Sequence, residues 1–262
     1  MDLVTLLQVV VGNMLIYSTP LILTALGGIF SERSGIVNIG LEGIMLSGAF
    51  ATTVVNIATG NPYLGILAGI IVGGLISLIH AVISINLKGD QIISGVAINL
   101  FAVATTSFLI KTLYGVAGTT PQAPYLANKK LVLIIIYAIA ILSHYLLFHT
   151  VLGLRIRAVG EHPLAADTVG ISVYKIRYIS VILSGMYAGL GGAYLTAVTL
   201  PSFSNNMSAG RGFMAMAAMI FGKWNPIGAI LASLLFAFGQ AFADVIKASN
   251  FPIPQQFLTM IQ

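Results

Sequence analysis

The most restrictive feature of this sequence is a carboxylate, Glu42, and an amide, Asn38, inside residues 31–50, a stretch that otherwise reads as a membrane span. An ionisable side chain at membrane depth costs roughly 2.5–3.5 kcal/mol on insertion scales, and such residues usually face a bundle interior or a water-filled cavity. A simple lipid anchor has no use for such a group. The stretch therefore predicts a protein with several membrane-crossing helices and a polar pathway among them.

The scarcity of charge points to the same environment. Charged residues make up 7% of the 262 residues and hydrophobic residues 58%, whereas a soluble domain carries about 25% charge. The net charge of +5 is small and lies mainly in connecting loops, which fits membrane topology better than nucleic-acid binding. We therefore expect membrane lipid, and no nucleic acid, among the partners. The absence of cysteine excludes disulfides and thiolate metal sites.

Apolar segments recur along the whole chain. Because a span needs roughly 20 apolar residues, the pattern predicts an all-α fold, a polytopic transmembrane helical bundle with about eight apolar segments. The segments are residues 3–29, 36–58, 63–87, 91–113, 131–148, 178–200, 213–222 and 227–246.

The segment at 213–222 is too short to cross a membrane, and Trp224, Asn225 and Pro226 follow it. One interpretation is a discontinuous or re-entrant helix, which is tolerated where protein or a cavity shields the freed backbone groups. The other interpretation is a single helix that is kinked at Pro226. The sequence leaves both open.

Charges in the loops predict the orientation. Loops rich in lysine and arginine stay on the cytoplasmic side, and the longest polar connection, residues 149–177, is of this kind. Alternation of the spans then places residues 114–130 outside, and residues 88–90 and 31–34 inside. The N-terminus lies outside if residues 36–58 cross the membrane. The charges in the longest loop are Arg155, Arg157, Lys175 and Arg177.

Glycines recur every fourth residue in two of the segments, at Gly65, Gly69 and Gly73 and again at Gly185 and Gly189. Such a smooth helical face allows two backbones to approach closely. The faces could form a sliding surface in a moving transporter or a static helix contact, and static packing is the simpler interpretation.

The polar loop contains a short predicted helix. Pro163 suits the first helical turn and Gly170 suits the position just past the end, while Glu161 lies near the positive N-terminus. A short exposed helix with small apolar residues fits a partner groove, although an interfacial amphipathic helix would look similar. Its small apolar surface consists of Leu164, Ala165, Ala166 and Val169.

Residues 32–43, Glu-Arg-Ser-Gly-Ile-Val-Asn-Ile-Gly-Leu-Glu-Gly, resemble a signature of the membrane permeases of bacterial ABC importers. The form with Glu-Arg-Ser-Gly and Gly-Leu-Glu-Gly resembles the nucleoside-importer permeases within a branch that also includes ribose and branched-chain amino-acid permeases. Further matches lie at residues 90–100, 153–163 and 221–226. The resemblance covers nearly the whole chain and implies one permease domain over residues 1–262, with residues 149–177 as its cytoplasmic coupling loop.

The resemblance also implies the partners. It implies an ABC ATP-binding subunit, a second homologous permease, an extracellular substrate-binding lipoprotein and a small-molecule substrate, all at the bacterial plasma membrane. ATP and Mg²⁺ would lie on partner subunits, with no cofactor in this chain. In such families the loop helix docks on the ATP-binding subunit, so the resemblance assigns this coupling role to Glu161, Pro163, Leu164, Ala165, Ala166 and Gly170.

The residues themselves show no catalytic or metal motif. A phosphate-binding Gly-x-x-x-x-Gly-Lys-Ser/Thr is absent, because Trp224 follows Gly222 and Lys223 and no glycine lies five residues upstream of Gly222. The four histidines lack metal-ligand spacing. We therefore expect no enzymatic activity in this chain, with ATP hydrolysis in a partner subunit.

Polar residues at membrane depth are the candidates for the translocation pathway: Asn38, Glu42, Ser94 and Asn99, with Asn13 and Gln240 as weaker candidates. Their amides and carboxylate could form transient hydrogen bonds with nucleosides. Structural alternatives remain. Glu42 could hold the turn at residues 31–35 or pair with Arg33, and Asn99 could tie two helices together, at about 0.6 kcal/mol on average.

Other functions also remain open. The substrate could be a ribose-type sugar or a branched-chain amino acid instead of a nucleoside. In another class, a proton-coupled secondary transporter could use Glu42 as its relay and the broken helix near Pro226 as its site. A membrane scaffold without transport activity is disfavoured by the buried polar residues.

The sequence stops at Gln262, six residues into what looks like a new apolar segment that follows Pro252 and Pro254. Related permeases continue through at least one more span. We therefore expect a truncated C-terminus, and glycine-rich surfaces such as Gly65–Gly73 covered by a second permease.

Overall fold

The structure is a computed structural model that describes residues 3–126 and 128–248. In this part of the chain the regular structure is helical and no strand is formed. The elements are α1 (Leu3–Arg33), α2 (Leu41–Thr59), α3 (Pro62–Ala81) with the π-helix η1 (Val82–Asn86), α4 (Gln91–Tyr114), α5 (Lys129–His149), α6 (Val151–Glu161), α7 (Pro163–Thr168), α8 (Val173–Tyr194) with the π-helix η2 (Leu195–Thr199), α9 (Arg211–Phe221) and α10 (Pro226–Ala248).

Among the described residues, seven helices are long and apolar enough to cross a membrane: α1, α2, α3 with η1, α4, α5, α8 with η2, and α10. The helix α9 is apolar but has only 11 residues. The prediction of an all-α polytopic bundle is confirmed, and α9 is the eighth, shorter apolar segment.

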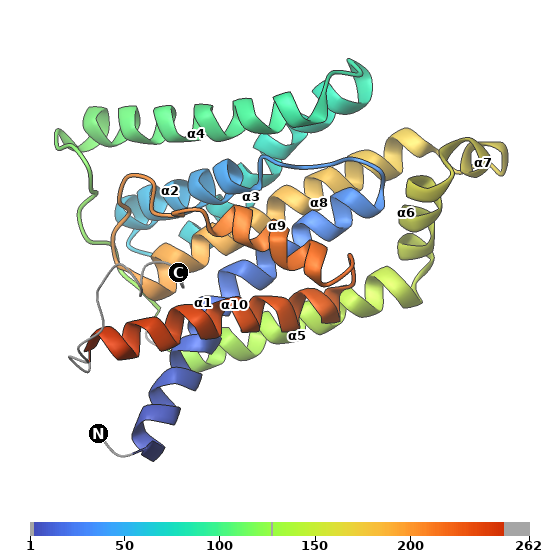
Figure 1. The fold of residues 1–262 in the computed structure, drawn as a ribbon. Helices are drawn as coiled ribbons and strands as arrows, with labels where there is room; N and C mark the ends of the chain where they lie inside the picture. The colour runs from blue at the N-terminus through green and yellow to red at the C-terminus, as the bar shows by residue number, and fades with distance from the viewer. Residues whose placement is uncertain (1–2, 127, 249–262) are drawn as a thin grey trace.

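The helix α8 is central, because α1, α2 and α3 all pack along it, and α10 packs against α1 on the other side. Figure 1 shows α4 along one edge of the bundle and α5 along the opposite edge. The helices α6 and α7 lie at one end. We call this the α7 end; it is formed by residues 31–35, 86–90, 149–177 and 222–225.

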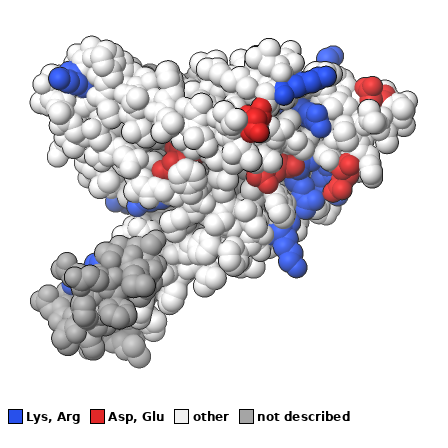
Figure 2. Space-filling view, turned by 45° about the horizontal axis from the view of Figure 1, so that its top comes forward, with Lys and Arg blue, Asp and Glu red and all other residues white. Residues whose placement is uncertain are grey.

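The loops alternate between the two ends as predicted. At the α7 end, Arg177 Nε donates to the carbonyl oxygen of Ser34 (3.2 Å). At the opposite end, Asn56 Nδ2 donates to the carbonyl oxygen of Pro124 (2.5 Å). Figure 2 shows lysine and arginine gathered mainly at the α7 end, which the positive-inside rule assigns to the cytoplasm.

Local sequence signals begin and end several helices. The Asp90 carboxylate caps α4 by accepting from the backbone N–H of Ile92 (2.8 Å) and Ile93 (3.0 Å). Asn61 caps α3 in the same way, with Pro62 as the first helical residue. Such caps satisfy backbone donors that a helix start leaves free. They fix where spans begin at the two surfaces of the bundle.

Glycines join α2, α3 and α8 backbone to backbone. A Cβ atom on Gly48 would lie 2.6 Å from Gly189 Cα, and one on Gly69 would lie 2.9 Å from the Gly48 carbonyl oxygen. A Cβ atom on Gly65 would lie 2.7 Å from the Thr52 carbonyl oxygen. The glycine face of α3 is therefore covered by α2 and α8 of the same chain. The expectation that a second permease covers it is wrong.

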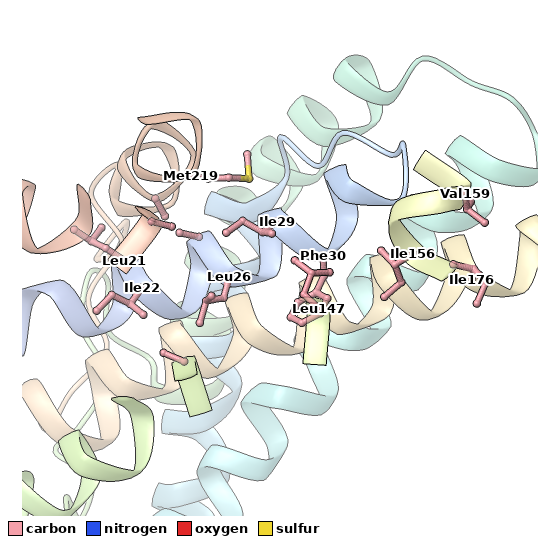
Figure 3. Close-up of a cluster of buried hydrophobic side chains, with 14 of the residues drawn as sticks. Leu21, Ile22, Leu26, Ile29, Phe30, Leu147, Ile156, Val159, Ile176 and Met219 are labelled. Atoms are coloured by element: carbon pink, nitrogen blue, oxygen red, sulfur yellow. The ribbon is translucent and has the colours of Figure 1, made fainter. Parts of the chain in front are cut away.

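A buried apolar cluster joins the α7 end to the membrane helices. Figure 3 shows side chains of α1 packed against residues from α5, α6, α8 and α9. Through this cluster the short helix α6, which is outside the set of membrane-crossing helices, is fixed to the long helices. The labelled members are Leu21, Ile22, Leu26, Ile29, Phe30, Leu147, Ile156, Val159, Ile176 and Met219.

Two helix boundaries differ from simple apolar runs. The run at 36–58 is helical only from Leu41, so residues 36–40 form a non-helical approach to α2. A turn at residues 222–225 separates α9 from α10, with Lys223 (φ 53°) and Trp224 (φ 52°) in left-handed conformations. The two helices fold back on each other, which excludes a single helix kinked at Pro226. The predicted apolar segment at 257–262 lies outside the described residues.

Candidate functional site

The non-helical residues 36–40 enter the bundle beside α8 and α4, where two predicted pathway amides hold them. Asn38 Nδ2 donates to Ser184 Oγ (3.1 Å), and Asn38 Oδ1 accepts from the Gly40 N–H (3.1 Å). Asn99 Oδ1 accepts from the Gly43 N–H (2.7 Å), and its Nδ2 donates to the Ile39 carbonyl oxygen (3.0 Å). Backbone groups at membrane depth need such internal partners. Both amides therefore support the entrance to α2.

Ser94 has a similar place nearer the α7 end. Its hydroxyl lies 2.9 Å from His80 Nδ1, and His80 Nε2 lies 3.0 Å from the carbonyl oxygen of Val37. The side chain of Gln91 accepts from the Val37 N–H (2.7 Å). His80 and Gln91 thus contact the backbone of Val37, and Ser94 contacts His80. Ser94 therefore has a structural partner inside the chain.

Glu42 caps α9 from the first turn of α2. Its two carboxylate oxygens accept from the backbone N–H groups of Gly210 (2.8 Å) and Gly212 (2.5 Å). The start of a helix offers free N–H donors and a positive dipole end, which together favour a carboxylate. Gly212 leaves room for the contact, since a Cβ atom there would lie 2.5 Å from Glu42 Cα. The sequence predicted that Glu42 holds the turn at residues 31–35 or pairs with Arg33. Both predictions are wrong.

Arg33 instead binds the turn between α9 and α10. Its Nε donates to the carbonyl oxygen of Trp224 (3.1 Å), and the neighbouring Glu32 accepts from Trp224 Nε1 (2.5 Å). Gly160 of α6 packs directly on the Arg33 carbonyl oxygen. The end of α1 is therefore in contact with both α6 and the turn that begins α10.

Two ionisable residues of this region were missed from the sequence, Arg211 beside Glu42 and Asp244 beside Arg211. Arg211, the first residue of α9, donates to the carbonyl oxygens of Met207 (3.1 Å) and Ser208 (3.3 Å), and its charge interacts with those of Glu42 and Asp244. Asp244 of α10 also forms a side-chain hydrogen bond with Tyr17 of α1. The rule that singled out Glu42, an ionisable group in an apolar segment, could have found Asp244 in segment 227–246, whereas Arg211 precedes segment 213–222.

A cavity of about 330 Å³ lies where Glu42 of α2 meets the start of α9. Glu42 and Asn99 line it, whereas Asn38, Ser94 and the weaker candidates Asn13 and Gln240 do not. One wall is exposed, as the side chain of Leu100 shows (69% exposed). The other lining residues are Gly43, Leu46, Val96, Val103, Asn206, Gly210 and Phe213.

Asn206 and Phe213 are further polar and aromatic groups of this cavity that the sequence did not single out. Asn206 has a left-handed backbone (φ 55°), and its side chain makes no hydrogen bond within the described part of the chain. Phe213 is 49% exposed on α9. The cavity thus combines an unengaged amide, an open aromatic ring and a carboxylate already bound to a helix start.

The predicted coupling helix is present as α7, with Pro163 in its first turn and Gly170 (φ 83°) just past its end. Leu164 is 83% exposed and Ala165 is also exposed. Ala166 differs from its neighbours, because it is 5% exposed and packs into the apolar cluster of Figure 3. The prediction that Ala166 belongs to an exposed docking surface is therefore wrong.

The last candidate of the loop is Glu161, which ends α6 and is exposed. It lines a cavity of about 500 Å³ together with Glu32, Lys223 and Trp224. Of the residues predicted for the coupling helix and its surface, Glu161, Leu164, Ala165, Val169 and Gly170 are exposed.

The structure is a bundle of membrane-crossing helices with a buried carboxylate among them and an exposed short helix at one end. This is the architecture of the membrane subunit of a transport system. The family model described as the branched-chain amino acid transport system / permease component matches residues 10–261. The chain therefore belongs to this family of permease components, and it is a multi-pass protein of the plasma membrane.

Curated relatives agree over nearly the whole chain. The guanosine ABC transporter permease protein NupQ of Bacillus subtilis is 46% identical, covering 94% of this chain and 85% of the relative. The nucleoside ABC transporter permease protein NupC of Lactococcus lactis is 46% identical, covering 99% and 90%. The putative glucose ABC transporter permease protein TsgC13 of Haloferax volcanii is 35% identical, covering 84% and 72%. ABC permeases in general work with an ATP-binding subunit and a substrate-binding protein.

Proposed function

We propose that this chain is the permease subunit of an ATP-driven ABC importer that moves nucleosides across the bacterial plasma membrane. The two relatives at 46% identity are named for guanosine and for nucleosides, and the relative at 35% is named for glucose. A ribose-type sugar is the second candidate substrate, and a branched-chain amino acid the third. Residues 1–262 act as one permease domain in this proposal.

The proposed mechanism is supported by a series of contacts that runs from α7 to the cavity at Glu42. The helix α7 packs on α6 through Ala166, and Gly160 of α6 packs on Arg33. Arg33 binds the Trp224 carbonyl oxygen in the turn that follows α9. The other end of α9 is bound by Glu42. A push on α7 is therefore transmitted to both ends of α9.

In this proposal an ATP-binding subunit docks on the exposed face of α7 at the cytoplasmic end and carries ATP and Mg²⁺. The sequence of this chain contains no phosphate-binding loop of the kind that ATP-binding subunits carry. An extracellular substrate-binding lipoprotein delivers the nucleoside at the opposite end. A second, homologous permease closes the exposed wall of the cavity, where Leu100 lacks cover.

The nucleoside passes the cavity beside Glu42. The ring of Phe213 can stack on a base, and the free amide of Asn206 can bond a base edge or a ribose hydroxyl. Glu42 and Asn99 shape this cavity but have partners within the chain. A weak site of this kind is sufficient when a binding protein supplies the affinity.

Uptake of labelled nucleoside by cells that express the whole transporter tests the proposal. With ATP maintained, a protonophore should leave uptake unchanged, and its loss would instead favour a proton-coupled secondary transporter. Excess unlabelled nucleoside should compete, whereas ribose, glucose and leucine should not. Phe213→Leu should raise KM for nucleoside, while Phe221→Leu is the matched control, because Phe221 lies on the same helix outside the cavity.

A further inference from the structure

A second cavity, of about 380 Å³, lies at the α7 end between η1, which continues α3, and the start of α8. The coupling helix α7 forms part of its wall. Figure 2 shows that charged side chains gather at this end of the molecule. The lining residues are Ser84, Ile85, Lys88, Pro163, Leu164, Asp167, Val173, Tyr174 and Arg177.

Two polar groups of this cavity have no partner among the described residues, and a third is only partly engaged. Ser84 is 8% exposed, and its buried Oγ has no hydrogen-bond partner in the described structure. The ammonium group of Lys88 forms no ion pair or hydrogen bond with any described residue. Arg177 uses its Nε to hold the Ser34 carbonyl oxygen, so its terminal nitrogens remain available. A buried hydroxyl without a partner is costly, and a bound group would remove that cost.

The charges favour an anion with a polar substituent. The lining contains two cations, Lys88 and Arg177, and one carboxylate, Asp167, so it has an excess of one positive charge. Ile85, Val173 and the ring of Tyr174 supply apolar surface beside the charges. A phosphate can bind Lys and Arg together, while a hydroxyl or ammonium group next to the phosphate can bind the carboxylate.

We propose that this cavity binds a phosphate ester, with the phosphate between Lys88 and Arg177 and Ser84 Oγ as a further donor. Two sources carry this chemistry at a cytoplasmic membrane surface. One is the headgroup of a phospholipid such as phosphatidylglycerol, since basic pockets between helices on this side suit lipid headgroups. The other is a soluble nucleotide, whose base would lie on Tyr174.

The site has a consequence for the coupling helix. Ser84 belongs to η1, which continues α3, and Lys88 to the loop that follows it, whereas Leu164 and Asp167 belong to α7. A bound phosphate ester would therefore link α7 to a membrane helix other than α1. Occupancy would reduce the freedom of α7 to move.

Lys88→Asn is the informative variant. Lys88 has a left-handed backbone (φ 52°), which asparagine tolerates better than most residues, so the charge is removed without backbone strain. Lys223→Asn is the matched control, because Lys223 has the same conformation (φ 53°) at the same end but lies outside the cavity. Ser84→Ala is a second variant that removes only the unpartnered hydroxyl.

The experiment uses the whole transporter purified in detergent and native mass spectrometry, with added phosphatidylglycerol, AMP or, as a neutral control, phosphatidylcholine. We expect Lys88→Asn to weaken binding of one phosphate probe about tenfold, as loss of a charged hydrogen bond predicts, and Ser84→Ala to weaken it less. Lys223→Asn should bind like the wild type. Phosphatidylglycerol dependence identifies a lipid site and AMP dependence a nucleotide site, and either supports the proposal. The proposal would be overturned if wild type and Lys88→Asn bound both probes equally. It would also be overturned if Lys88→Asn lost the ATP-binding subunit without a change in phosphate binding.

Discussion

Gly160 of α6 lies directly on the carbonyl oxygen of Arg33, at the last residue of α1, with no space for a side chain between them. We expect Gly160→Ala to push α6 away from α1 and to lower the free energy of unfolding by about 1–3 kcal/mol, the usual range for overpacking. Thermal unfolding of the purified transporter and nucleoside uptake measure the effect. Gly12→Ala is the matched control, since no atom lies within 4 Å of a Cβ there. Equal stability of both variants would contradict a tight contact.

The cap on α9 predicts a graded response at Glu42. Gln keeps one carbonyl oxygen for Gly210 or Gly212, so Glu42→Gln should fold and retain uptake at reduced stability. Glu42→Leu leaves two N–H groups without a partner and removes one of the two carboxylates whose charges interact with Arg211, with a loss of about 1–3 kcal/mol for each orphaned N–H group. Unfolding and uptake of both variants give the order. A stably folded Glu42→Gln transporter without uptake would support a proton relay instead.

The exposed face of α7 predicts that Ala165→Arg uncouples transport. Arginine at this exposed position leaves the fold of this chain intact but places a bulky charge where a partner groove would fit. ATP-dependent uptake should be lost while the protein remains in the membrane. Ala117→Arg, at an exposed position of the opposite end, should transport normally. Normal uptake by Ala165→Arg would rule out docking through this face.

The end of the same helix predicts a separate effect. Gly170 has φ 83° and no atom within 4 Å of a Cβ position. Gly170→Val should therefore reduce uptake through backbone strain alone, because a β-branched residue strongly disfavours this conformation. Gly170→Asn, which tolerates it better, should retain most of the uptake. Equal uptake by the two variants would show that the left-handed turn is unimportant.

The hydrogen bond between Trp224 and Glu32 predicts the effect of Trp224→Phe. Phenylalanine keeps most of the ring volume but removes the Nε1 donor, so the half-buried Glu32 loses its charged hydrogen bond. We expect a stability loss at or below the range of about 1.5–3 kcal/mol for such bonds, since water reaches this part of the surface. ATP-driven uptake should fall with it, because the turn between α9 and α10 loosens. Unchanged uptake would exclude this contact from the coupling path.

The sequence was sufficient to predict Glu42 as a special residue but not its partners. A carboxylate in an apolar run is visible in any sequence, because its burial is costly. Its actual partner is the backbone N–H of Gly212, 170 residues away, and a backbone donor has no signature in residue types. Asn99 is an intermediate case, since a tie between helices was one predicted role and the bonds to Gly43 and Ile39 have this form.

Helix spans were predictable because apolar length and helix ends depend on local sequence. The positions of α9 and α10 as separate helices were left open, since Trp224 and Pro226 fit both a kink and a turn. The inward orientation of Ala166 was not predictable, because six residues make less than two helical turns and define no clear face. The covering of the α3 glycines by α2 and α8 required the tertiary contacts themselves.

The close contact of Gly48 with Gly189, and of Gly69 with Gly48, has a mechanical consequence. Backbones that touch through glycine have no rotamers with which to absorb a displacement, so α2, α3 and α8 are a single stiff block. Asn99 attaches α4 to this block, and Glu42 attaches α9. The centre of the described bundle is therefore stiff. We expect a push at its cytoplasmic end to tilt these helices together, as a lever does.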